Sequence, residues 1–233
     1  MQSLQDQFTA LVVGASGGIG KALAGRLNAD MRCARLVRLD RVVETGFDLR
    51  REETIELISR RLSDEGLTLD LVIDATGVLT VDCEAPEKKL SALDPAIMAE
   101  AFAINTIGPA LLFKHFVGLL PRGRKSIFAT LSARVGSIGD NRLGGWISYR
   151  SSKAALNQVV RTASIEISHR RPHAVCAALH PGTVATSLSA PYVGSRTTLA
   201  PDHAAQKILV VLDQLNATAS GGFFDYDGRP IEW

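Results

Sequence analysis

The sequence predicts an α/β domain, with a doubly wound, mostly parallel sheet of about seven strands, that spans residues 1–233 as a single domain. Three observations favour this class. Short apolar runs alternate with longer amphipathic runs, as expected for parallel strands connected by helices. A glycine-rich turn separates the first apolar run from the first helical run. The 233 residues, of which 46% are hydrophobic, suit one buried core.

The strands and helices follow from hydrophobic periodicity. Residues 8–13 form an apolar run typical of a buried strand, and Leu23 and Leu27 share one face of the helix that follows. The expected strands are residues 8–13, 34–39, 69–73, 126–131, 174–179 and 221–225, and the expected helices are residues 21–27, 52–62, 95–120 as one helix or two, 149–169 and 201–215. No internal repeat or linker divides the chain.

Composition argues against several classes of protein. The longest apolar runs fall far short of the roughly 20 residues that a membrane-spanning helix needs. Residues 1–7 lack the basic start and apolar stretch of a secretory signal, so we expect a cytoplasmic protein. Cys33, Cys83 and Cys176 are widely spaced and odd in number, which predicts reduced thiols and no metal site. A formal charge of +2 without a long basic block predicts no nucleic-acid or membrane partner.

Residues 14–20, Gly-Ala-Ser-Gly-Gly-Ile-Gly, lie between the first expected strand and the first expected helix. Backbone N–H groups and a helix N-terminus at this place can face a pyrophosphate. Glycine permits the tight turn, the close approach of a phosphate and the close packing of helix on strand. A glycine cluster can also be a surface turn, but its position here favours nucleotide binding. The spacing is Gly14-x3-Gly18-x-Gly20 rather than the commoner Gly-x-Gly-x-x-Gly.

Tyr149 and Lys153 lie four residues apart in an expected helix, so both side chains emerge from one face. An ammonium beside a phenol favours the phenolate and lowers the phenol pKa from its ordinary value of about 10. Tyr149 could then exchange a proton with a carbonyl or alcohol oxygen while hydride passes to or from a nicotinamide ring. Any amphipathic helix can carry such a pair, but the glycine turn upstream favours the catalytic interpretation.

These motifs resemble those of the short-chain dehydrogenase/reductase family. The family pattern Gly-x3-Gly-x-Gly stands at Gly14, Gly18 and Gly20, and its Tyr-x3-Lys stands at Tyr149 and Lys153. The resemblance covers nearly the whole chain. It implies a Rossmann-type fold and an NAD(P)-dependent oxidoreductase that interconverts a carbonyl compound and its alcohol. In this interpretation Tyr149 is the general acid/base, and Lys153 lowers its pKa and holds the cofactor ribose.

The resemblance also assigns the rest of the cofactor site. Residues 74–77 are similar to the family's Asn-Asn-Ala-Gly segment beside the adenosine, residues 48–49 to its acidic adenine-binding position, and residues 181–186 to the segment that meets the nicotinamide. Asn105 matches the family's helix asparagine, which kinks its helix and supports the proton relay through a water, although it could also bond local backbone. The residues expected to bind the cofactor are Gly14, Ser16, Gly17, Gly18, Ile19, Gly20, Asp40, Asp48, Leu49, Ala75, Thr76, Gly77, Asn105, Tyr149, Lys153, Pro181, Gly182, Val184 and Thr186.

The sequence departs from the family pattern at the catalytic serine. The family's Ser-Ser-x-x-Gly corresponds to residues 132–136, and Ala133 stands where the family's substrate-binding second serine is expected. A hydrogen-bond donor near a developing alkoxide is useful chemistry, so Ser132 is the expected catalytic serine. Because adjacent residues on a strand point to opposite faces, Ser132 can replace the serine missing at Ala133 only if the strand ends or bulges there. Ser137 is the alternative.

Asp40 ends the second expected strand, about twenty residues after the glycine turn, where a carboxylate bonds the ribose hydroxyls of NAD and repels a 2′-phosphate. Arg38 and Arg41 flank it, and either could pair with a 2′-phosphate if Asp40 turned away. A solvated turn would contain the same residues. The pattern favours NAD(H) over NADP(H).

The substrate pocket is expected in two loops, residues 187–200 and 140–146, by the same resemblance. Trp146 and its apolar neighbours would make the pocket largely apolar, and Arg142 and Arg196 could meet an anion. We expect a small carbonyl or alcohol substrate and a homodimer or homotetramer built through the helices of residues 95–120 and 149–169.

Two other classes of function remain open. One is a dinucleotide-binding sensor or scaffold with weak turnover, which the displaced serine favours and the Tyr149/Lys153 pair disfavours. The other is a lyase or isomerase on the same fold, which would keep its activity without nucleotide.

Overall fold

The computed structural model describes residues 1–82, 84–195 and 197–233, so the expectations for Cys83 and Arg196 lie outside the described residues. A parallel sheet of six strands forms the centre of the fold, in the order β2-β1-β3-β4-β5-β6. The strands are β1 (Phe8–Val13), β2 (Cys33–Leu39), β3 (Leu71–Asp74), β4 (Ser126–Leu131), β5 (Ala174–His180) and β6 (Gly222–Asp225). The chain winds outward from β1 to β2 and then returns to β3 on the other side of β1. This reversal opens a crevice at the carboxyl ends of the strands.

The doubly wound α/β class is confirmed, and all six segments predicted as strands are strands. Within the described residues the sheet has six strands, where about seven were expected. The reason lies in residues 40–51, which connect β2 to helix α2 (Glu52–Asp64) through turns. A further parallel strand would need its own crossover of a dozen or more residues, and this connection has no room for both. Phe47 enters the core from it without joining the sheet.

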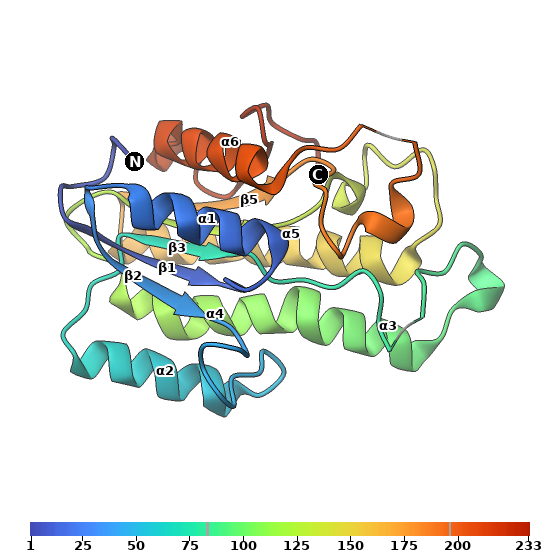
Figure 1. Ribbon diagram of the computed structural model, residues 1–233, viewed down its shortest axis with the longest axis horizontal. Helices are drawn as coiled ribbons and strands as arrows, with labels where there is room; N and C mark the ends of the chain where they lie inside the picture. Colours follow the sequence, from blue (N-terminus) through green and yellow to red (C-terminus); the bar gives the residue numbers. More distant parts are fainter. Residues whose placement is uncertain (83, 196) are drawn as a thin grey trace.

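Helices cover both faces of the sheet (Figure 1). Helix α1 (Gly18–Ala29) and helix α6 (Pro201–Gln214) pack together on one face, where Leu23 and Ile208 are fully buried. Helix α5 (Ile147–Arg170), α4 (Gly108–Phe116) and α2 cover the other face, where Phe128 and Leu156 are fully buried. Because neighbouring residues of a strand face opposite sides, each strand contributes to both layers.

Residues 95–119 are continuously helical but not uniformly so. Asp94 caps α3 (Pro95–Phe102) by accepting two backbone N–H bonds, and a π-helical turn (Ala103–Ile107) separates α3 from α4. Within the described part of the chain, this stretch alone is long and apolar enough to cross a membrane, with a mean hydropathy of 1.5. Its Phe113 and Phe116 are buried against the sheet, however, which is the packing of a core helix. The π-helical turn is the irregularity expected at Asn105.

Candidate active site

The turn between β1 and α1 depends on close contacts that only glycine allows. A Cβ at Gly20 would lie 2.1 Å from the carbonyl oxygen of Gly14, and a Cβ at Gly18 would lie 2.5 Å from Cγ2 of Thr186. Gly14 itself has a φ of +78°. No described side chain caps the start of α1, so its first N–H groups are available to an anion. This cradle fits the pyrophosphate of a dinucleotide.

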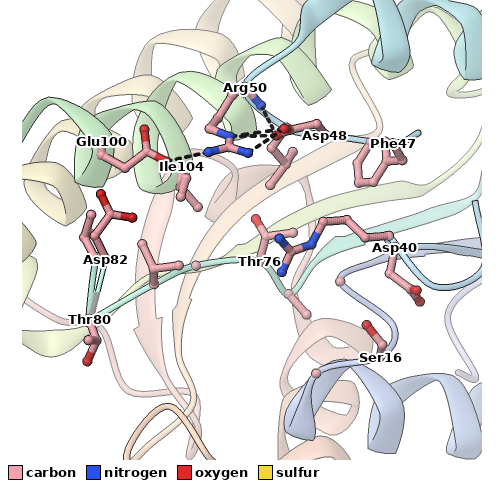
Figure 2. A pocket seen from close by; sticks show the side chains of 18 residues that line it. Ser16, Asp40, Phe47, Asp48, Arg50, Thr76, Thr80, Asp82, Glu100 and Ile104 are labelled. Atoms are coloured by element: carbon pink, nitrogen blue, oxygen red, sulfur yellow. Dashed lines mark hydrogen bonds and ion pairs between the residues drawn. The ribbon is translucent and has the colours of Figure 1, made fainter. Parts of the chain in front are cut away.

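A cleft of about 380 Å³ lies beyond this turn, at the carboxyl ends of β1, β2 and β3 (Figure 2). Among the residues expected to bind the cofactor, those that line it are Gly14, Ser16, Gly17, Asp40, Asp48, Leu49, Ala75, Thr76 and Gly77. Sequence reasoning missed Phe47, Arg50, Val78, Thr80, Val81, Asp82, Glu100 and Ile104, which line it as well. Most of these follow a strand end or come from α3, and no local motif marks them. Arg41 lines the cleft, whereas Arg38 is exposed on β2 and does not.

The buried carboxylate of Asp74 holds the segment of residues 74–77 in place through hydrogen bonds. Asp74 accepts hydrogen bonds from the backbone N–H of Thr76 at 2.9 Å and from the hydroxyl of Thr130 at 2.6 Å. Burial raises the pKa of Asp74, and these hydrogen bonds act against that rise. The segment therefore presents Thr76 and Gly77 to the cleft in a fixed conformation.

The two acidic residues expected at the adenosine end have different partners. Arg50 donates to Asp48 through Nε at 3.0 Å and Nη2 at 2.7 Å, and its Nη1 donates to Glu100 at 2.9 Å (Figure 2). The Arg50 hydrogen bonds lower the pKa of Asp48 to about 2. Asp40 instead accepts the N–H groups of Val42 at 2.8 Å and Val43 at 3.0 Å. One oxygen of Asp40 is thus engaged by its own turn.

The cleft reaches two of the candidate catalytic residues at Gly77. A Cβ there would lie 3.2 Å from both the Oδ1 atom of Asn105 and the Nζ atom of Lys153. On the opposite side of the glycine turn, Thr186 touches Gly18 and brings the segment of residues 181–186 beside it. Asn105 and Lys153 thus adjoin the cleft through Gly77, and Thr186 adjoins the glycine turn through Gly18.

Asn105 and Lys153 are both buried. The Oδ1 atom of Asn105 accepts the N–H of Val78 at 2.8 Å, and its Nδ2 donates to the Val78 carbonyl at 2.9 Å. Asn105 thus bonds a distant segment of backbone that lines the cleft, rather than local backbone. Lys153 donates to the carbonyl oxygen of Leu131 at 2.9 Å. Burial lowers the pKa of Lys153 to about 8, although the nearby charge of Asp74 acts in the opposite direction.

Tyr149 lies in the first turn of α5, one turn before Lys153. Burial raises the pKa of its phenol to about 12, whereas sequence reasoning expected Lys153 to lower it. The physical reason is desolvation, which disfavours the charged phenolate, and in the described chain the Lys153 ammonium donates to Leu131 and not to the phenol. A phenol with this pKa is protonated at neutral pH.

The two candidate serines differ in what their hydroxyls do. Ser132 is 4% exposed, and its hydroxyl donates to Oδ1 of Asn157 at 2.6 Å. Its single proton is therefore engaged inside the fold. The hydroxyl oxygen of Ser137 accepts the N–H of Asp140 at 3.0 Å, and no described residue accepts its proton. Ser137 keeps a donor free, as the substrate-binding role requires.

An aromatic group stands beside Tyr149. The ring of Trp146 lies edge-on to Tyr149 at 6.4 Å between centroids and to Tyr192 at 5.5 Å. The hydroxyl of Tyr192, in the 3-10 helix η5 (Ala190–Tyr192), lies 2.6 Å from the hydroxyl of Thr80. The loop expected to form the substrate pocket is thereby attached to the wall of the cleft. Sequence reasoning placed Trp146 at the pocket but could not find the contact with Thr80, since 112 positions separate its partners.

The fold and cleft define a doubly wound protein with a dinucleotide site. The chain matches the family model described as short chain dehydrogenase over residues 8–196. It is 33% identical to 1-hydroxy-2-glutathionyl-2-methyl-3-butene dehydrogenase of Rhodococcus sp. (strain AD45), over 97% of this chain and 99% of the relative. The chain therefore belongs to the short-chain dehydrogenase/reductase family and is an oxidoreductase of that class.

Solved structures agree with this assignment. The NADPH-bound carbonyl reductase from chicken fatty liver superposes with a TM-score of 0.85 at 24% identity, covering 99% of this chain and 96% of that one. A putative short-chain dehydrogenase/reductase from Burkholderia multivorans with bound NADP superposes with a TM-score of 0.78 at 26% identity, covering 97% and 100%.

Proposed function

We propose that the protein is an NADP(H)-dependent carbonyl reductase in which Tyr149 protonates the substrate oxygen. The observation that carries this proposal is the position of Tyr149, one helical turn before a buried lysine whose Nζ atom adjoins Gly77 in the wall of the cleft. The phenol, whose pKa burial raises, is protonated at neutral pH. A group protonated at working pH is a general acid, and carbonyl reduction consumes a proton at the oxygen.

The chain's own residues would hold the cofactor. The glycine turn would take the pyrophosphate on backbone N–H groups, and Thr76 and Gly77 would lie along the adenosine half. Arg41 lines the cleft beside Asp40 and can pair with a 2′-phosphate. The sequence favoured NAD(H) because of Asp40, but one oxygen of that carboxylate is occupied by Val42 and Val43. Two similar structures have NADPH or NADP bound, which also supports NADP(H).

The bound cofactor would supply the hydride that reduces the carbonyl carbon. Tyr149 would donate its phenolic proton to the carbonyl oxygen, so that the carbon gains hydride, the oxygen gains a proton and an alcohol results. The Lys153 ammonium would stabilise the phenolate that remains. Asn105 would keep Val78 and the adjoining wall of the cleft in place through its two hydrogen bonds.

A serine would hold the substrate oxygen during this transfer. Ser132 is the serine nearest to the family motif position, but its proton is donated to Asn157. We therefore favour Ser137, whose proton is available. Ser137→Ala should lower turnover by about 100-fold, whereas Ser132→Ala should mainly lower stability. A larger loss of turnover in Ser132→Ala, with folding intact, would return the role to Ser132.

The function is tested by the consumption of NADPH and NADH, side by side, with small aldehydes, ketones and quinones. A glutathione-conjugated alcohol with NADP⁺ belongs in the set, because the Rhodococcus relative is named for such a compound. We expect faster turnover with NADPH, and Arg41→Ala should remove this preference. Faster turnover with NADH would contradict the assignment of Arg41. Tight cofactor binding without turnover on any compound would instead favour a sensor.

We also propose a homodimer built through α4 and α5. Phe113, Val159 and Ala163 line a groove between these helices, and the family resemblance places the interface there. Leu156 is buried in the core and does not contribute to this surface. Light scattering should give a dimer mass for the wild type and a monomer mass for Ala163→Glu. A monomeric wild type would contradict the proposal.

A further inference from the structure

Helix α5, which carries Tyr149 in its first turn, begins without a cap of its own. The preceding residue, Trp146, has a φ of 52° and a ψ of 44°, a left-handed conformation, and its side chain makes no capping hydrogen bond. Gly144 and Gly145 also have positive φ, at 63° and 65°. The first N–H groups of a helix need acceptors from elsewhere. Three left-handed residues therefore precede α5, and the first N–H groups of this helix need acceptors from another segment of the chain.

Glu87, from the connection between β3 and α3, supplies these acceptors. Its Oε1 atom accepts the backbone N–H of Ser148 at 2.5 Å and the Ser148 hydroxyl at 2.6 Å. Its backbone carbonyl accepts the N–H of Trp146 at 2.5 Å. Glu87 is 9% exposed and Ser148 is 4% exposed. One residue, 61 positions upstream of Ser148, thus makes three hydrogen bonds to the start of the catalytic helix.

The charge of Glu87 suits this place. The N-terminus of a helix carries a partial positive charge, and a carboxylate there is stabilising. A buried carboxylate needs hydrogen-bond donors, and Ser148 provides two. Removing either partner would leave the other without its buried hydrogen bonds, so the pair holds Ser148 in one position. Tyr149 is the next residue along the chain, so a fixed Ser148 also fixes the Cα of Tyr149.

We propose that Glu87 is a positioning residue, which acts through Ser148 to hold the phenol of Tyr149 where the substrate oxygen binds. This inference rests on the proposed role of Tyr149 as general acid. Without the carboxylate the first turn of α5 frays, and the phenol spends part of its time out of place. Cofactor affinity is retained, because it depends on the glycine turn and the cleft at the other end of the site.

The test compares Glu87→Ala, Glu87→Gln and the control Glu84→Ala. Glu84 is exposed on the same connection, and its backbone pairs with Val81. Glu87→Ala should lower kcat by about 10- to 100-fold and the melting temperature by a few degrees, while the Kd of NADPH changes little. Glu87→Gln should restore most of kcat, since an amide oxygen can accept the N–H of Ser148. Glu84→Ala should match the wild type.

A second readout does not need turnover. In a Trp233→Phe background, Trp146 is the remaining tryptophan, and its fluorescence reports the entry to α5. Glu87→Ala should shift the Trp146 emission in the absence of cofactor, and Glu84→Ala should not. If Glu87→Ala does not fold, Ser148→Ala takes its place, because it removes the 2.6 Å bond alone and should lower kcat several-fold.

The proposal fails if Glu87→Ala, or Ser148→Ala in its place, keeps kcat within about two-fold of the wild type with unchanged Trp146 emission. It also fails if kcat, cofactor affinity and melting temperature fall together, since that would show a structural role only. These outcomes differ from a failure of the proposed function. In that case Tyr149→Phe would keep its turnover, while Glu87→Ala would still shift the Trp146 emission.

Discussion

The candidate site has a cofactor half, formed by the glycine turn and the cleft beside it, and a catalytic half, formed by Tyr149, Lys153 and the segments around them. The two halves are built by different means. In the cofactor half, the shape comes from backbone that side chains must not fill, as the 2.1 Å approach of a Gly20 Cβ to Gly14 shows. In the catalytic half, side chains from distant segments hold the parts together, as Glu87 holds Ser148 and Thr80 holds Tyr192. The first half is encoded within a few consecutive residues, and the second half exists only after folding.

The largest effect on cofactor binding is expected where a side chain is added to the glycine turn. Gly20→Ala should weaken NADPH binding by more than about 100-fold and destabilise the fold by several kcal/mol, because the new Cβ would overlap the Gly14 carbonyl. Gly25→Ala in the same helix is the matched control, since its Cβ would meet nothing within 4 Å. It should raise stability by up to about 1 kcal/mol. Titration with NADPH and urea unfolding measure both effects, and normal binding by Gly20→Ala would refute the backbone account.

The second effect concerns His180, at the end of β5, whose buried Nδ1 has no hydrogen-bond partner among the described residues. Burial lowers the pKa of His180 to about 4, so the unfolded chain takes up this proton first as the pH falls. The contribution of the neutral His180 to the free energy of unfolding is therefore complete above pH 6.5 and is lost as the pH falls from 6.5 to 4. His180→Gln should remove up to about 3 kcal/mol of this pH-dependent loss. Parallel urea-unfolding curves for both proteins across this range would contradict the prediction.

A smaller effect is expected at the contact between loop and cleft. Tyr192→Phe removes the hydroxyl that lies 2.6 Å from Thr80, and the KM for the carbonyl substrate should rise about 2- to 10-fold with kcat little changed. Thr80→Val should have the same effect. The double variant should be no worse than either single one, because the two share one interaction. Additive losses would show that the contact does not close the loop.

The sequence predicts most of the fold and the cofactor half because their signals are local. All six strand segments follow from apolar runs, and the glycine turn, Asp40, Asp48 and Ala75 lie at the cleft as expected. The strand count of about seven differs by one, since residues 40–51 are too short to form another crossover and strand. Neither composition nor hydrophobic periodicity shows whether a connection is long enough to form a further crossover and strand.

The catalytic half is less predictable, for a physical reason. Tyr149 and Lys153 are found by their spacing, but the pKa of Tyr149 depends on burial, and Lys153 donates to the carbonyl of Leu131, 22 positions away. The hydroxyl of Ser132 is engaged by Asn157, 25 positions away. Contacts between residues so far apart in the chain leave no periodic pattern, so a motif can name the residues without giving their partners.

Tyr149→Phe tests the central claim most directly, because it removes one hydroxyl and leaves the ring beside Trp146. The measurement is kcat for carbonyl reduction together with the Kd of NADPH, for the wild type and the variant under the same conditions. We predict a loss of about 100- to 10,000-fold in kcat with a Kd within about two-fold of the wild type. A variant that keeps most of its turnover would contradict the account, since the proton would then come from another group.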